Sequence, residues 1–77
     1  MSKSITGFNA AATKGRNAAI LYCQHWQNEI RMESTLLAEN FVNRKIKSIE
    51  YNNKRVELNK RTKDLNECIK MLDRQFG

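Results

Sequence analysis

The sequence contains no proline and only three glycines, Gly7, Gly15 and Gly77. These two residue types interrupt helices most strongly, and neither occurs between residues 16 and 76. The β-branched residues are scattered, and no segment alternates apolar and polar residues over the length of a strand. The sequence therefore predicts an all-α fold.

Long apolar runs and a dense cysteine pattern are also missing. No run approaches the roughly 18–20 apolar residues needed to cross a bilayer, and the first eight residues lack the apolar core of a secretory signal. We therefore expect a cytoplasmic protein without membrane contact. In a reducing compartment its two cysteines, Cys23 and Cys68, are expected to be free thiols.

The chain is too short to bury a large core. A domain of 77 residues removes only about 60–65% of its unfolded surface from water, so its stability is marginal unless something is added. Oligomerisation is the natural addition, because there is no cysteine framework and no metal-ligand spacing. We expect residues 1–8 to form a flexible tail and residues 9–77 to form a single helical domain, with Thr6 or Asn9 as the first helix cap.

The C-terminal third carries the clearest periodicity. Its stripe advances by alternating steps of four and three residues, which average to the 3.5-residue period of helices packed against a partner helix. The stripe comprises Tyr51, Arg55, Leu58, Thr62, Leu65, Ile69, Leu72 and Phe76. Most other positions in this segment are charged or amide-bearing, so the stripe requires a partner.

Two further apolar stripes precede this one and face other directions. On a helix, the first would group Ala19, Cys23, Trp26, Ile30, Leu37 and Phe41. The second would group Ala38, Val42, Ile46, Ile49 and Val56. Because one straight helix would leave much of this surface in water, we expect a helical hairpin or a three-helix chain with coiled-coil-like packing. The candidate joints are residues 31–35, which offer helix-capping hydroxyls, and residues 51–53, which contain two asparagines.

The positive charge is concentrated in one window. Residues 42–63 hold eight basic and two acidic residues, which accounts for the whole net charge of +6. Such a window could track the phosphates of a nucleic acid, or it could be a solvated face that keeps the protein in solution. No zinc-ligand spacing, helix-turn-helix glycine or aromatic platform for bases accompanies it.

Cys23 and His25 are the residues most suggestive of chemistry, but their spacing opposes it. Two positions apart on a helix, they point in directions separated by about 160°. Cys68 would add only a third metal ligand. We therefore expect no catalytic residue, metal, cofactor or small-molecule substrate, and we interpret Cys23 as a core residue.

These patterns predict a non-enzymatic helical interaction module, such as an assembly chaperone, an adaptor or a modulator of a larger machine. It would bind a protein partner, including itself, and assemble into a homo-oligomeric bundle. The predicted interface comprises Trp26, Ile30, Leu58, Leu65, Ile69, Leu72 and Phe76. For Trp26, the alternative to an interface role is packing in the core of the same chain. The alternative function is nucleic-acid binding through Arg44, Lys47, Lys54, Arg55 and Arg61. A third interpretation is a chain that folds only on its partner.

Overall fold

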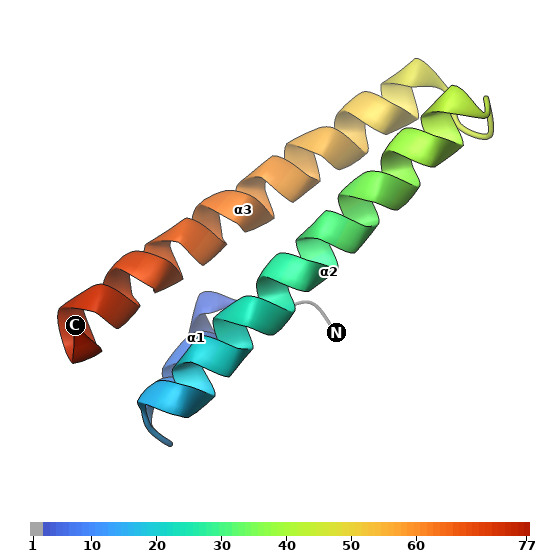
Figure 1. Cartoon of the computed structure of the whole chain (residues 1–77). Helices are drawn as coiled ribbons and strands as arrows, with labels where there is room; N and C mark the ends of the chain where they lie inside the picture. Colours follow the sequence, from blue (N-terminus) through green and yellow to red (C-terminus); the bar gives the residue numbers. More distant parts are fainter. Residues whose placement is uncertain (1–2) are drawn as a thin grey trace.

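A computed structural model describes residues 3–77 of the chain. It contains three helices, α1 (Ile5–Ala12), α2 (Arg16–Val42) and α3 (Ser48–Phe76), and no strand among the described residues. The predicted all-α fold is confirmed. Figure 1 shows α2 and α3 as long antiparallel helices lying side by side, with the short α1 near the start of α2 and the end of α3.

The molecule is elongated, with principal extents of 44 × 20 × 16 Å. We call the end where α2 begins and α3 finishes the proximal end, and the end that carries the α2–α3 turn the distal end. The main core lies proximally, where α1 adds a third layer. Its fully or almost fully buried members are Phe8, Ala19, Cys23, Trp26, Leu65 and Cys68.

The distal half is a two-helix structure with little interior. Leu37 and Leu58 are its buried residues, and the rings of Phe41 and Tyr51 stack with centroids 4.4 Å apart. Two packed helices bury only the side chains along their line of contact, because the rest of each helix surface stays open to solvent. The furrow between α2 and α3 is therefore less enclosed distally than proximally.

Helix α1 begins earlier than the sequence indicates. Ser4 is its N-cap, and the Ser4 hydroxyl accepts a hydrogen bond from the Gly7 backbone N–H at 3.2 Å. The Tyr22 hydroxyl on α2 accepts from the Ser4 N–H at 2.9 Å. Residues 5–8 are thus helical and Phe8 is fully buried, so the expected flexible tail does not extend to residue 8. A β-carbon on Gly7 would collide with the Tyr22 hydroxyl and the ring carbon that bears it.

Both expected positions of the hairpin joint are wrong. Residues 31–35 lie inside α2, where the Thr35 hydroxyl donates to the Arg31 carbonyl at 3.0 Å instead of capping a new helix. Residues 51–53 lie inside α3. The turn occupies residues 43–47, and the break before α2 is at Gly15, whose φ of 127° favours glycine.

The α2–α3 turn begins with a helix-ending motif. The Lys45 N–H donates to the Asn40 carbonyl at 2.8 Å, and the Arg44 N–H donates to the Phe41 carbonyl at 3.1 Å. This pair of bonds defines a Schellman cap, which places one residue in the left-handed conformation. That residue is Arg44, with φ of 59°. A position that usually holds glycine or asparagine is therefore occupied by a residue with a β-carbon.

We expect Arg44→Gly to raise the free energy of unfolding by about 1 kcal/mol, because glycine adopts this conformation without steric strain. For a chain of this size, that gain corresponds to a rise in Tm of roughly 4–8 °C. Thermal unfolding followed by circular dichroism measures the change. Lys45→Gly is the matched control, since it removes a neighbouring cation where φ is not positive. A gain of equal size in the control would contradict the explanation.

Candidate functional site

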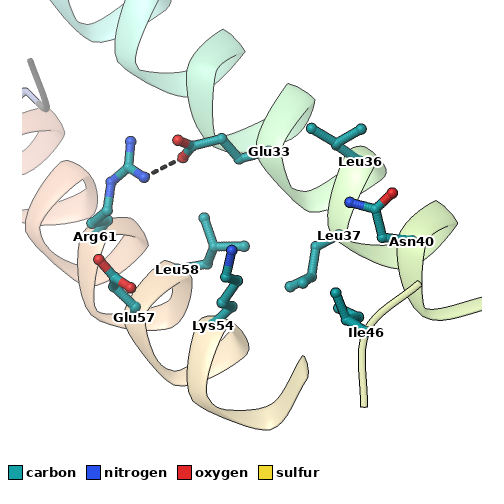
Figure 2. Close-up of a pocket in the computed structure, with 9 residues that line it drawn as sticks. All are labelled: Glu33, Leu36, Leu37, Asn40, Ile46, Lys54, Glu57, Leu58 and Arg61. Carbon is teal, nitrogen blue, oxygen red and sulfur yellow. Dashed lines mark hydrogen bonds and ion pairs between the residues drawn. The ribbon is translucent and has the colours of Figure 1, made fainter. Parts of the chain in front are cut away.

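The furrow between α2 and α3 is filled by α1 proximally and open distally. The open part is a groove with a cavity volume of about 340 Å³, which we call the distal groove. Figure 2 shows side chains from both long helices and from the turn converging on it. Its lining residues are Glu33, Leu36, Leu37, Asn40, Ile46, Lys54, Glu57, Leu58 and Arg61.

The floor of the distal groove is apolar. Leu37 and Leu58 form its base and are only 5% and 7% exposed. Leu36 is 58% exposed, and Ile46 from the turn is half-buried. A second helix laid on these four side chains would bury apolar surface that is now in water, at about 25 cal/mol per Å² before ordering costs. The groove therefore has an apolar floor that is partly open to water, bordered by polar and charged side chains.

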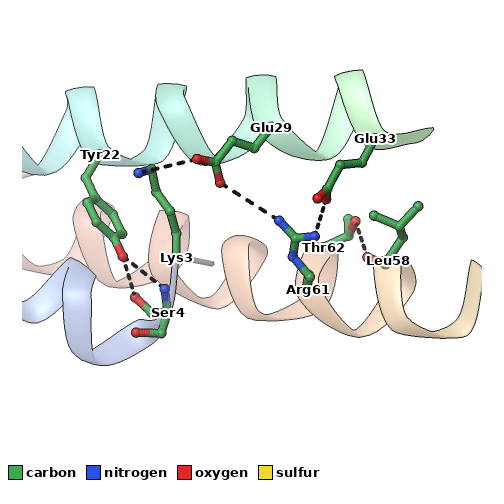
Figure 3. Close-up of polar contacts among 8 residues, drawn as sticks. All are labelled: Lys3, Ser4, Tyr22, Glu29, Glu33, Leu58, Arg61 and Thr62. Atoms are coloured by element: carbon green, nitrogen blue, oxygen red, sulfur yellow. Dashed lines mark hydrogen bonds and ion pairs between the residues drawn. The ribbon is translucent and has the colours of Figure 1, made fainter. Parts of the chain in front are cut away.

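A polar cluster marks the boundary between the distal groove and α1. Arg61 forms ion pairs with Glu33 and with Glu29, the latter at 3.9 Å. Lys3, which directly precedes α1's cap, contacts the other oxygen of Glu29 at 3.6 Å. Figure 3 shows this chain of contacts from α1's start across α2 to α3. Because Arg61 also lines the groove, the groove adjoins the N-terminal end of α1.

The predicted interface residues lie mostly inside the chain itself. Trp26 is fully buried and Leu65 is 4% exposed, both in the proximal core. Ile69 is 39% exposed, and Leu58 belongs to the groove floor. The remaining three pack against the proximal core and are half-buried: Ile30, Leu72 and Phe76. Leu65, Leu72 and Phe76 of the predicted stripe therefore pack within the same chain, and among the predicted interface residues only Leu58 lines the groove.

The candidate cations for nucleic-acid binding do not share one helix face. The turn separates Arg44 and Lys47 from the others, which lie on α3. Lys54 lines the distal groove, whereas Arg55 is exposed and does not line it. Arg61 is held by two carboxylates. The single basic face expected for a continuous helix is consequently divided.

The two thiols are both in the proximal core. Burial raises the pKa of Cys23, and burial, followed by the nearby Cys23, raises the pKa of Cys68 to about 11. A thiol that stays protonated at neutral pH is a poor nucleophile and a poor metal ligand. His25 is exposed, and residues 3–77 contain no group of three or more potential metal-binding side chains. Cys23 and Cys68 therefore contribute to the packing of the proximal core, whereas His25 lies outside it.

The raised pKa of Cys68 predicts a loss of stability in alkali. Since the folded-state value of about 11 lies above the unfolded value near 9.0, the stabilisation is complete below pH 9 and is lost as pH rises towards 11. The loss attributable to this group is up to about 2–3 kcal/mol. Urea unfolding between pH 8 and 11 should show a steeper decline in the wild type than in Cys68→Ala. Parallel declines would contradict this assignment.

The groove residues are harder to find in the sequence than the core residues. Leu36 lies off the first apolar stripe, and Ile46 belongs to the second, displaced stripe. Those two irregularities are the signals that point to the groove, and they become interpretable only once the turn is placed at residues 43–47. The structure leaves other large apolar side chains exposed as well, namely Leu21, Met32, Phe41, Val42, Ile49, Val56 and Ile69.

Among the described residues, no helix is both long and apolar enough to cross a membrane. Comparison of the chain with protein-family models, with curated proteins and with solved structures gave no match.

Proposed function

We propose that this protein is a non-enzymatic helical interaction module that binds a helix of a partner protein in the distal groove. The observation that carries the proposal is the unequal filling of one furrow. Proximally, α1 occupies it and buries Phe8 completely. Distally, the furrow has an apolar floor and no occupant among residues 3–77. Insertion of an amphipathic helix into such a groove is a common mode of protein recognition.

The charged residues around the groove support binding rather than catalysis. Glu33 and Arg61 neutralise one another in an ion pair, and Lys54 and Glu57 are exposed on α3. Such groups can orient a partner and exclude mismatched ones. Within this proposal, the protein acts as an assembly chaperone, an adaptor or a modulator, and a second copy is one form that the partner could take.

Nucleic-acid binding is the alternative and has less support. The cations of residues 42–63 are split between the turn and both sides of α3, and Arg61 is already paired. Unpaired surface cations are common on basic proteins without this function. The two functions differ in what they require of Leu36, because phosphate contacts gain nothing from an apolar groove floor.

Two matched substitutions test the function. Leu36→Gln alters the groove, whereas Val56→Gln alters an exposed apolar residue that does not line it; the exposed fractions are 58% and 68%. Each variant and the wild type are used to retain proteins from an extract of the source cells, with and without nuclease treatment, and each is also sedimented alone. The proposal is supported if Leu36→Gln no longer retains partners or self-associates while Val56→Gln still does. Retention that depends on nucleic acid, or equal behaviour of both variants, contradicts it.

A further inference from the structure

Helix α1 is an internal example of what the α2–α3 furrow accepts. It presents Ile5, Phe8 and Ala12 to the core, at steps of three and four residues that lie on one side of a helix. Phe8 is the one large side chain of α1 that is completely enclosed. Between residues 5 and 12 the chain carries no charge. The proximal furrow thus takes a short, uncharged helix with one apolar edge.

The distal groove continues this furrow but differs in its electrostatic surroundings. Resting on the function proposed above, we infer that the occupant of the distal groove is an acidic amphipathic helix of another protein. It would lie along α2 and α3 beyond the start of α1. Its apolar edge would cover Leu36, Leu37, Ile46 and Leu58, and its carboxylates would face the cations of the distal end.

The charge argument depends on which cations already have partners. The ion pairs among residues 3–77 involve Lys3, Arg61 and Lys70 as the basic members. No carboxylate among those residues lies within 4.0 Å of the side-chain nitrogens of Arg44, Lys45, Lys47 and Lys54, which are four of the five basic residues in the distal half. All four are exposed. A helix with acidic flanks would supply the missing counter-charges.

A second copy of the chain is a poorer match for this groove. Residues 43–57 hold five basic and two acidic residues, so the distal half of another copy would bring the same excess of positive charge. Like charges placed together across an interface oppose association. A nucleic acid supplies negative charge but has no apolar edge to cover the exposed Leu36. A helix with an apolar edge and acidic flanks covers the floor and meets the unpaired cations of the distal end, of which Lys54 lines the groove beside the carboxylates Glu33 and Glu57.

The size of the groove sets the length of the occupant. On α2 the lining runs from Glu33 to Asn40, which spans about 10–12 Å at 1.5 Å per residue. A helix of two to three turns matches this span, and the cavity of about 340 Å³ admits inserted side chains rather than a whole helix. Such a small contact corresponds to a weak or transient interaction, with Kd in the micromolar range.

Selection from a peptide library tests the inference and does not require the partner to be identified. The probe is a phage-displayed set of helices with varied apolar residues fixed at positions i, i+3, i+4 and i+7. The other positions are drawn equally from Glu, Lys and Gln. The full-length chain is the immobilised target. We expect the recovered helices to be enriched in Glu, and their binding to weaken at least tenfold in Leu36→Gln and in Lys54→Glu.

Two controls accompany these variants. Val56→Gln and Lys60→Glu change exposed residues of α3 that do not line the groove, and they should bind the selected helices within about threefold of the wild type. Recovery of neutral or Lys-rich helices that still require Leu36 would overturn the acidic assignment and leave the interaction function standing. Recovery of no helix that requires Leu36 would overturn both.

The same variants also test the two competing occupants of the groove, a second copy of the chain and a nucleic acid. Sedimentation of the chain alone that shows a dimer in the wild type, but a monomer in Leu36→Gln, would identify a second copy as the occupant. Duplex DNA that displaces the selected helices, and binds Leu36→Gln as tightly as the wild type, would identify a nucleic-acid surface. Either result overturns the inference. A monomeric chain whose selected helices are not displaced by duplex supports it.

Discussion

Replacement of Trp26 by alanine is expected to lower the free energy of unfolding by about 3–5 kcal/mol. Trp26 is fully buried and lies in the proximal core with Leu65 and Cys68 of α3. Its ring also meets Tyr22 edge-on, with centroids 6.0 Å apart and an interplanar angle of 82°. Such a pair contributes about 0.5–1.5 kcal/mol beyond the burial of its area.

The expected loss is large relative to the total free energy of unfolding. Natural domains are stabilised by about 0.05–0.15 kcal/mol per residue, which is about 4–12 kcal/mol for a chain of this length. Urea unfolding measured by circular dichroism at 25 °C should therefore show a much lower midpoint for Trp26→Ala than for the wild type. A loss below about 1 kcal/mol would show that Trp26 is not a core residue.

Trp26→Phe is the informative control. The indole Nε1 is buried and has no hydrogen-bond partner among residues 3–77, so its removal leaves no other group unsatisfied. Phenylalanine keeps most of the apolar volume and eliminates the buried donor. We expect this variant to retain most of the stability lost in Trp26→Ala. Equal destabilisation by both substitutions would indicate a specific role for the indole.

The spacing of apolar residues predicted the helices because helix packing repeats along the chain. The steps of seven residues from Leu58 to Leu65 to Leu72 place these side chains along one contact line, and the structure buries the first two and half-buries the third. Such a repeated signal survives uncertainty about any single residue. The same reasoning grouped Ala19, Cys23 and Trp26, which all lie in the core.

The turn could not be found in this way because its decisive residue is atypical. Arg44 adopts a left-handed conformation that glycine or asparagine usually supplies, so nothing in the residue type marks the end of α2. Residues 51–53 contain the more typical turn residues but remain helical. Phe41 and Tyr51 lie on opposite sides of the turn, and the stacking of their rings favours a joint between them over the expected joints.

The groove was missed for a related reason. The groove lies where α1 does not cover the two long helices. The N-terminal end of α1 is set by the hydrogen bonds between Ser4 and Tyr22, which are 18 residues apart in the sequence. Local patterns do not report that contact. Once α1 is placed, Leu36 and Ile46 change from irregular apolar residues to the exposed part of an uncovered floor.

Core and groove occupy opposite ends of the molecule, which suits a binding role. The proximal end has three layers and encloses the aromatic side chains Phe8 and Trp26, whereas the distal end has two helices and a turn. Regions with few buried apolar contacts open locally at lower free energy than the core. On the proposed function, the distal half would adjust to a partner while the proximal core preserves the fold.

Phe8→Ala is expected to release α1 from the hairpin and to lower the free energy of unfolding by about 3–5 kcal/mol. Phe8 is fully buried, and it is the principal anchor of a helix of only 8 residues. A helix this short is not stable in water without packing. Once the ring is removed, Ile5 and Ala12 are the apolar contacts of α1 that remain with the core cluster.

Two measurements follow the release of α1 directly. Amide hydrogen exchange within α1 should accelerate more than in the middle of α2, because local detachment precedes global unfolding. The emission of Trp26, the only tryptophan, should shift to longer wavelength as the proximal core becomes wet. Asn9→Ala changes the neighbouring exposed residue and should leave both signals in place. If Phe8→Ala behaves like Asn9→Ala, α1 does not fill the furrow as described, and the comparison between α1 and the occupant of the distal groove loses its basis.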